Sequence, residues 1–263
     1  MYDFAYQKPA SVADAVKLLA DPEAKALAGG QTLIPVLKQR LNKPTTVVDL
    51  ARLGLSGITV AGGTVTVGAM TTHATVAASA DVKRAIPALA QLAGGIGDPA
   101  VRYRGTIGGS LANNDPTADY PAAALALGAT IKTDKREIAA DDYFQGMFAT
   151  ALEPGEVITA VSFPVPEKAG YVKFPNPASR YAMVGVFVAK GPKGVRVAVT
   201  GAGQNGVFRH SAYEQAMAKS WSAAALDGVA TPADGLNSDI HASAEYRAHL
   251  VDVMAKRALA AAG

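Results

Sequence analysis

Two periods of hydrophobic residues, one typical of a helix and one of a strand, alternate along this chain. Residues 11–21 repeat apolar side chains with the helical period and predict an amphipathic helix. Apolar runs at 24–28 and 45–50 predict buried strands, and 32–41 predicts a short helix that begins at Thr32. The first fifty residues are therefore expected to form a small α/β unit.

The middle of the chain mixes the same two patterns. Alternating apolar residues over 57–70 predict a hairpin that turns at a double glycine. Helices are expected at 71–79 and 81–93, with a break at Pro87, since proline removes a helical hydrogen bond. We further expect an alanine-rich helix at 121–127, a strand at 130–133 and a strand that ends at Phe163.

The last third follows a proline-rich stretch, 164–181, which predicts a boundary between domains 1–175 and 176–263. Strands are expected at 181–190 and 194–203, and helices at 211–219 and 243–262. In the last helix, one predicted apolar face consists of Tyr246, Leu250, Val251, Met254 and Ala258.

Composition narrows the class of protein. The sequence is 49% hydrophobic and 18% charged, which excludes a disordered chain. No apolar run approaches the roughly 20 residues of a transmembrane helix, and the first residues lack a signal-peptide pattern. We therefore expect a soluble cytoplasmic protein. The net charge of +3 is spread along the chain, so nucleic-acid binding is not expected.

The sequence contains no cysteine, which excludes a thiol nucleophile and an iron–sulfur cluster bound by this chain. Its four histidines lack the spacing of a zinc site, so no metal ligand is predicted. No pairing of a nucleophile with a base is evident either. The sequence therefore predicts no catalytic residue of its own.

Two glycine clusters carry the candidate chemistry. In "KALAGGQTLIPVLKQR", Gly29 and Gly30 stand between a strand and a helix, where a simple turn and an anion-binding backbone nest are equally good interpretations. "GTIGGSLANN", residues 105–114, offers a second loop of small residues, and two loops suit the two phosphates of a pyrophosphate. Neither matches the Rossmann fingerprint or the P-loop.

Three segments are similar to one known family: "LAGGQTLIPVLKQR", "GAMTTHATVAAS" and "IGDPAVRYRGTIGGSLANNDPTADYPAA". They closely resemble the FAD-binding medium subunit of molybdenum hydroxylases, the relatives of carbon monoxide dehydrogenase and xanthine dehydrogenase. The similarity continues over nearly the whole chain. It implies an α/β (α+β) fold: a two-lobed FAD-binding domain of the vanillyl-alcohol-oxidase/PCMH type, followed by a small α+β domain.

The resemblance also implies cofactors and partners. FAD is expected to bind non-covalently, whereas the molybdenum cofactor and two [2Fe–2S] clusters are expected in a large and a small partner subunit. A dimer of heterotrimers is the implied assembly. In this scheme FAD takes electrons from the clusters and passes them to an external acceptor, while another chain binds the substrate.

The family's cofactor contacts transfer to matching positions here. The pyrophosphate is assigned to Leu27, Ala28, Gly29, Gly30, Gln31, Thr32, Leu33 and Ile34 in the first loop and to Thr106, Ile107, Gly108, Gly109 and Ser110 in the second. Family members often have asparagine where Ser110 stands. The remaining assigned contacts are Asn114, Asp119, Ile158, Lys173 and Tyr181.

Several assignments have a structural alternative. Asp119 also suits a helix N-cap, Lys173 a solvated loop and Tyr181 an ordinary core aromatic. A lysine beside the flavin would supply positive charge where negative charge develops. Two further positions depart from the family besides Ser110. Arg180 replaces a frequent aspartate, and Ile96 replaces a phenylalanine, so no aromatic stacking is expected at Ile96.

For His73, a capping or packing role is the favoured interpretation. Two other functions stay open at this point. One is a stand-alone flavoenzyme of the same fold group, such as the enolpyruvyl-UDP-N-acetylglucosamine reductases, which would need its own acid or base. The other is an assembly subunit that has lost its flavin, which the intact glycine motifs argue against.

Overall fold

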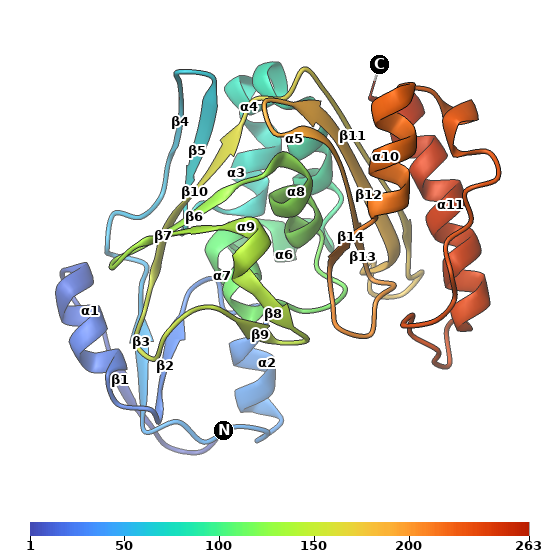
Figure 1. The fold of residues 1–263 in the computed structure, drawn as a ribbon. Coiled ribbons are helices and arrows are strands. Elements are labelled where there is room, and N and C mark those ends of the chain that lie inside the picture. Colours follow the sequence, from blue (N-terminus) through green and yellow to red (C-terminus); the bar gives the residue numbers. More distant parts are fainter. Residues whose placement is uncertain (263) are drawn as a thin grey trace.

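The N-terminal lobe consists of a three-stranded parallel sheet and two helices (Figure 1). The computed structural model describes residues 1–262. The sheet has the order β1-β3-β2, and the lobe consists of β1 (Ala5–Gln7), α1 (Val12–Leu19), β2 (Ala24–Leu27), α2 (Leu33–Lys38) and β3 (Thr46–Asp49). The predicted α/β unit is confirmed.

Local signals explain most of this lobe. Ser11 Oγ accepts the backbone N–H of Asp14 and caps α1. The predicted second helix is shorter than expected, since α2 ends at Lys38. Thr32 is at its N-cap position, but its side chain caps no N–H group. The glycine loop follows the carboxyl end of β2, which is where open parallel sheets bind ligands.

The second sheet is antiparallel and brings together strands from distant parts of the sequence. Its order is β4-β5-β10-β6-β7. The predicted hairpin is confirmed, with Gly62 and Gly63 at its turn. The elements of this region are β4 (Ile58–Ala61), β5 (Thr64–Gly68), β6 (Thr130–Thr133), β7 (Glu137–Ala139), α9 (Ala140–Tyr143), β8 (Phe144–Gly146), β9 (Ala149–Thr150) and β10 (Ile158–Pro164).

Six helices lie between β5 and β6 in the sequence. They are α3 (His73–Ala78), α4 (Ala80–Ala85), α5 (Pro87–Gly94), α6 (Pro99–Arg104), α7 (Ile107–Asn113) and α8 (Tyr120–Leu127). The predicted break at Pro87 is confirmed, since this residue begins α5. Helix α7 was not predicted, because its two glycines disfavour helix in isolation. Helix α6 was also not predicted, although Asp98 caps it and Pro99 stands in its first turn, where proline is favoured.

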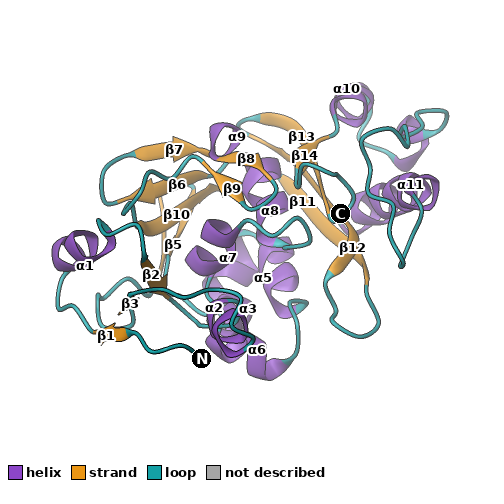
Figure 2. Ribbon diagram, turned by 90° about the horizontal axis from the view of Figure 1, so that it is seen from below, coloured by secondary structure: helices purple, strands orange, loops and turns teal. Residues whose placement is uncertain are grey.

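Helix α8 forms the centre of the molecule. All eight of its residues are buried, as expected for a helix that is apolar on every side. It contacts β12 and β13 on one side and β10 on the other, and Figure 2 shows it between the two sheets. The largest hydrophobic core therefore joins the second sheet to the C-terminal one.

The C-terminal sheet has the order β11-β12-β13-β14, with α10 and α11 on its outer face (Figure 1). Its elements are β11 (Lys168–Pro175), β12 (Ala182–Gly191), β13 (Gly194–Thr200), β14 (Phe208–Arg209), α10 (Ser211–Lys219), the 3₁₀ helix η1 (Ala223–Leu226) and α11 (Ala244–Ala261). No helix within residues 1–262 has the length and apolar character that crossing a bilayer requires.

The structure adds three details to what the sequence predicted for this region. Strand β11 was not predicted, and it pairs with β12 from Lys168↔Lys190 to Pro175↔Ala182. The expected division at 175/176 falls between these paired strands, and we propose a division before Lys168. Tyr246 is 44% exposed and packs edge-on against Phe174, so it lies at the margin of the apolar face of α11.

Candidate functional site

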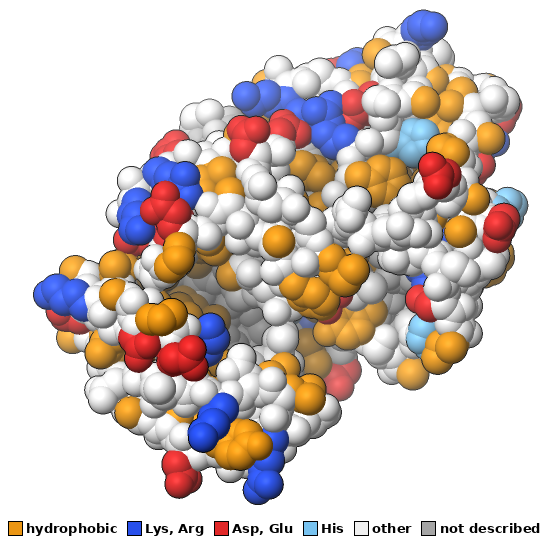
Figure 3. Space-filling model, turned by 60° about the horizontal axis from the view of Figure 1, so that its bottom comes forward, with side chains coloured by type: hydrophobic (Ala, Val, Ile, Leu, Met, Phe, Trp, Pro, Cys, Tyr) orange, Lys and Arg blue, Asp and Glu red, His pale blue; other side chains and the backbone are white. Residues whose placement is uncertain are grey.

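A cavity of about 500 Å³ lies where the N-terminal lobe meets the helices of the second lobe. This volume is typical of small-molecule and cofactor sites, and a recess opens on this face of the molecule (Figure 3). Thirteen of the eighteen predicted contact residues line it: Ala28, Gly29, Gly30, Gln31, Thr32, Leu33, Thr106, Gly108, Gly109, Ser110, Asp119, Ile158 and Tyr181. The structure thus brings both glycine loops to one cavity.

The other five predicted residues lie behind its wall. Leu27 and Ile34 pack beneath the first loop, and Ile107 is fully buried in the core. The Asn114 side chain donates to the carbonyl oxygens of Gly146 and Ala149, at 2.8 Å each. Asn114 therefore holds the β8–β9 hairpin, and its side-chain amide is used there and does not line the cavity. Lys173 does not line the cavity, but it contacts Asp119, which does.

The first loop presents unused backbone donors to the cavity. Gly30 adopts a φ of +76°, which glycine adopts without strain. Within residues 1–262, none of the N–H groups from Gly29 to Leu33 donates to a protein acceptor. A row of free N–H groups beside a cavity is a site for an anion, because each donor needs an acceptor oxygen.

Gly29 is required by the contact between the two loops. A methyl group on Gly29 would lie 2.0 Å from the carbonyl oxygen of Arg104 and 2.8 Å from Cα of Gly105. Both atoms belong to backbone, so no side-chain rotation relieves the overlap. Of the two interpretations of this glycine pair, Gly29 serves close packing of the loops, while Gly30 shapes the turn.

The second loop uses its own backbone donors internally. The N–H groups of Ile107 and Gly108 donate to Thr71 O and Ala69 O, and that of Gly109 donates to Thr106 Oγ1. Thr106 Oγ1 caps α7 in this way. The second loop therefore offers hydroxyl groups to a phosphate, and the first loop is the main source of N–H donors.

Asp119 is held by two partners, Tyr171 and Lys173, of which only Lys173 was predicted as a contact. Its Oδ1 accepts from the hydroxyl of Tyr171 at 2.5 Å and lies 2.9 Å from Lys173 Nζ. Burial raises the pKa of the Asp119 carboxyl, and Lys173 and Tyr171 partly offset that rise. Asp119 occupies the N-cap position of α8 but caps no helical N–H group, so its carboxylate is free for this cluster.

The alternative roles of Lys173 and Tyr181 do not fit the structure. Lys173 is on β11 and its side chain is 10% exposed, so it is not a solvated loop lysine. Tyr181 is 49% exposed at the cavity, so it is not an ordinary core aromatic. Arg180, which precedes it, adopts a φ of +63° in the turn between β11 and β12. That turn sets Tyr181 at the edge of the cavity.

Four further charged or titratable residues line the cavity and were not predicted as contacts: Lys25, His73, Asp115 and Glu156. Glu156 is enclosed and receives two hydrogen bonds from Arg136, at 3.0 Å each, which contribute most to lowering its pKa to about 2. His73 is 5% exposed, and burial lowers its pKa to about 4. No local pattern pointed to Glu156, because its partner Arg136 lies 20 positions away, and the sequence favoured only a capping or packing role for His73.

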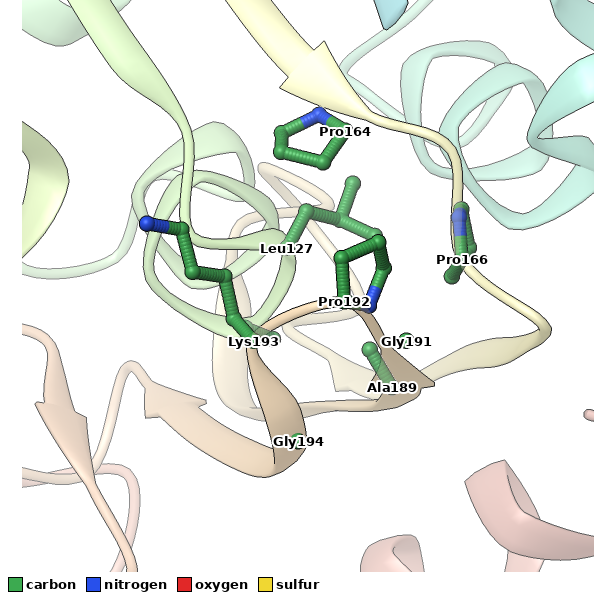
Figure 4. A pocket seen from close by; sticks show the side chains of 9 residues that line it. Leu127, Pro164, Pro166, Ala189, Gly191, Pro192, Lys193 and Gly194 are labelled. Atoms are coloured by element: carbon green, nitrogen blue, oxygen red, sulfur yellow. The ribbon is translucent and has the colours of Figure 1, made fainter. Parts of the chain in front are cut away.

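A second, much smaller cavity lies at the seam between β10 and the C-terminal sheet (Figure 4). Its volume is about 10 Å³, room for a single water, and its labelled lining includes Pro164, Pro166, Pro192 and Lys193. Among residues 1–262, no group of histidine, aspartate and glutamate is arranged to hold a metal. The large cavity is therefore the candidate site.

Comparison with known proteins agrees with this geometry. Residues 2–166 match the family described as "FAD binding domain in molybdopterin dehydrogenase". The chain is an FAD-binding medium subunit of the molybdenum hydroxylase family. The matched range covers both glycine loops and the strand that carries Ile158.

Individual relatives of this medium subunit extend the match to its full length. It is 36% identical to the carbon monoxide dehydrogenase medium chain of Afipia carboxidovorans, over 97% of this chain and 95% of that one. It is also 36% identical to the nicotine 6-hydroxylase medium subunit of Paenarthrobacter nicotinovorans, over 98% and 96%. A structure of reconstituted CO dehydrogenase from Oligotropha carboxidovorans superposes with a TM-score of 0.91, at 35% identity over 99% and 98%. The predicted family, two-lobed FAD-binding fold and FAD cofactor are confirmed.

Proposed function

We propose that the two glycine loops hold the pyrophosphate of FAD and that Asp119, Ile158 and Tyr181 form the flavin end of the same cavity. The observation that carries this proposal is the row of free N–H groups from Gly29 to Leu33. The positive end of an N–H dipole attracts phosphate oxygens, so these backbone donors hold the pyrophosphate directly. The hydroxyls of Thr106 and Ser110 face the same cavity.

The flavin end is electrically balanced by this chain's own residues. FAD, when bound, supplies the redox chemistry of the subunit. Lys173 and Asp119 form a pair whose formal charges cancel, and Tyr171 donates to the same carboxylate. The electric field of this cluster at a neighbouring flavin ring is therefore smaller than the field of an unpaired lysine. The main role of the pair is to fix the positions of its polar atoms.

A stand-alone flavoenzyme is disfavoured by the state of the carboxylates at the cavity. Each is held by a protein group: Glu156 by Arg136, Asp119 by Tyr171 and Asp115 by Thr117. Glu156, with a pKa of about 2, is a poor general base at neutral pH. The chain is thus suited to carrying electrons, as proposed for a subunit whose substrate is oxidised elsewhere.

For this chain we further propose the partners that its family position implies. A molybdenum-cofactor large subunit oxidises the substrate, and a small subunit passes the electrons on through [2Fe–2S] clusters to FAD. A dimer of heterotrimers in the cytoplasm is the proposed assembly. The sequence contains no cysteine, so any cluster has to be bound by another chain.

Titration of the purified apo chain with FAD tests the site. We expect one FAD per chain and its full release on acid denaturation. Gly29→Ala should weaken binding at least tenfold, because its methyl group forces the loops apart. Gly94→Ala is the matched control, since its methyl group meets only Ala77 Cβ at 3.7 Å. Equal FAD affinity of the two variants, or flavin left on a peptide, would contradict the proposal.

A further inference from the structure

His73 is an unpartnered polar side chain at the wall of the large cavity. It is 5% exposed, and its backbone N–H donates to Gly105 O at 2.9 Å. Neither ring nitrogen makes a hydrogen bond within residues 1–262, and Nδ1 is fully enclosed. Nε2 lies against the second loop, where a methyl group on Gly105 would be 2.5 Å away. Gly105 therefore leaves room for this ring.

The surroundings of the ring determine its protonation. Burial, followed by the nearby positive charge of Arg102, lowers the pKa of His73 to about 4, so the ring is neutral near pH 7. A neutral imidazole carries one N–H group. A buried N–H without an acceptor is rarer in proteins than a buried acceptor without a donor. The proton therefore belongs on Nε2, at the cavity wall, and the bare lone pair on enclosed Nδ1.

We propose that Nε2–H of His73 donates a hydrogen bond to a phosphate oxygen of the FAD pyrophosphate. The place of the ring supports phosphate as the acceptor, because Gly105 joins Thr106 to Arg104, the residue that contacts Gly29 of the first loop. The inference rests on the proposed function and adds a donor that lies outside both glycine motifs. The capping role expected as one alternative from the sequence is provided by Thr72 instead, whereas the ring does pack against Tyr120, with 5.4 Å between ring centroids.

A second buried histidine provides a matched comparison. His210 is 7% exposed, its Nδ1 accepts from Tyr213 N–H and its Nε2 bonds Thr231 Oγ1 at 3.1 Å. Both of its nitrogens thus have protein partners, and it is not part of the cavity lining. If both buried histidines served only the stability of the fold, substitution of His210 would lower the free energy of unfolding and the FAD affinity more than substitution of His73.

Two amide substitutions separate the ring nitrogens. The side-chain nitrogen of glutamine can reach the position of Nε2, whereas that of asparagine reaches only the position of Nδ1. We expect His73→Gln to bind FAD and ADP within about threefold of wild type and His73→Asn to bind both about five- to tenfold more weakly, the loss of one hydrogen bond. His210→Asn should lower the urea midpoint of the apo protein and leave both affinities unchanged.

The measurements are calorimetric titrations with FAD and ADP, urea unfolding of each apo variant, and nitrogen NMR of the labelled histidines. ADP carries the pyrophosphate without the flavin, so a matching loss for ADP identifies the phosphate. NMR should show the Nε2–H tautomer of His73 and a shift of that nitrogen on ADP binding. Equal affinities of His73→Asn and His73→Gln, or affinity losses that follow the urea midpoints, would overturn the proposal. A wild-type chain that binds no FAD would instead refute the proposed function.

Discussion

Glu156 is the charged group whose contribution to stability can be worked out most directly. Its side chain is fully enclosed, and four hydrogen bonds reach its two oxygens. Two come from Arg136, one from Thr133 Oγ1 at 2.7 Å and one from the N–H of Glu153 at 2.8 Å. These contacts lower its pKa from 4.5 to about 2. They join β6, the β6–β7 turn and the segment that leads to Ile158 in the cavity wall.

The size of this contribution follows from the pKa. Each pKa unit corresponds to about 1.4 kcal/mol, so the native state favours the ionised form of Glu156 by about 3 kcal/mol. Arg136 is 42% exposed, and water takes over part of its interaction when the partner is neutral. We therefore expect Glu156→Gln to lower the free energy of unfolding by about 2 kcal/mol at pH 7.

The dependence on pH has a definite sign. A carboxyl group whose pKa is lower in the folded state stabilises that state above its unfolded pKa of 4.5, and the stabilisation is lost as the pH falls toward 2. The difference between wild type and Glu156→Gln should be constant from pH 8 to about pH 5.5 and then decrease as the pH falls.

Urea unfolding at several pH values measures this difference. Glu153→Gln is the control, because its side chain is 56% exposed and exposed ion pairs typically contribute about 0.2–1 kcal/mol. A loss of less than about 0.5 kcal/mol for Glu156→Gln at pH 7, or a difference that stays the same at pH 3.5, would refute the reasoning.

Two further substitutions test separate contacts. Asn114→Ala removes two hydrogen bonds and places alanine at a φ of 42°, so it should lower the free energy of unfolding by about 3 kcal/mol. Asn114→Gly should lower it by about 1 kcal/mol less. Urea unfolding of both variants measures these losses. Gly170→Ala should detach α11 from β11, because its methyl group would lie 2.0 Å from Ala258 O. The expected result is faster amide hydrogen exchange along 244–261 with unchanged FAD affinity. Unchanged exchange would contradict the packing of α11 on β11.

The elements that the sequence predicted correctly are those whose signals are local. The hairpin around Gly62 and Gly63, the start of α5 at Pro87 and the cap of α11 at Ser243 each depend on residues within a few positions. Helix α7 was not predicted because glycine disfavours helix. Tertiary contacts override that preference, since the N–H of Gly108 donates to Ala69 O in the turn after β5.

The same distinction applies to the site. The two glycine loops could be found as motifs, and the resemblance to a family placed the cofactor between them. His73 lies in one of the resembling segments, but only the structure shows that its ring has no partner. Tyr171 and Glu156 could not be found that way. Each acts through a residue far away in the sequence, such as Asp119 for Tyr171, 52 positions apart. Lys173 was predicted as a flavin contact, and only the structure shows that its charge is matched by Asp119.

The small N-terminal lobe has a core of its own, and this has a consequence for how cofactor loading can be followed. Its buried cluster consists of Ala15, Leu19, Ala24, Val48 and Leu50, with Val157 as its buried member from the second lobe. A pyrophosphate held between the first and second loops would tie the two lobes together. Loss of the cofactor should therefore raise protease cleavage and amide exchange first in residues 1–50, in proportion to the binding free energy removed. That lobe then serves as a built-in reporter of whether the subunit is loaded.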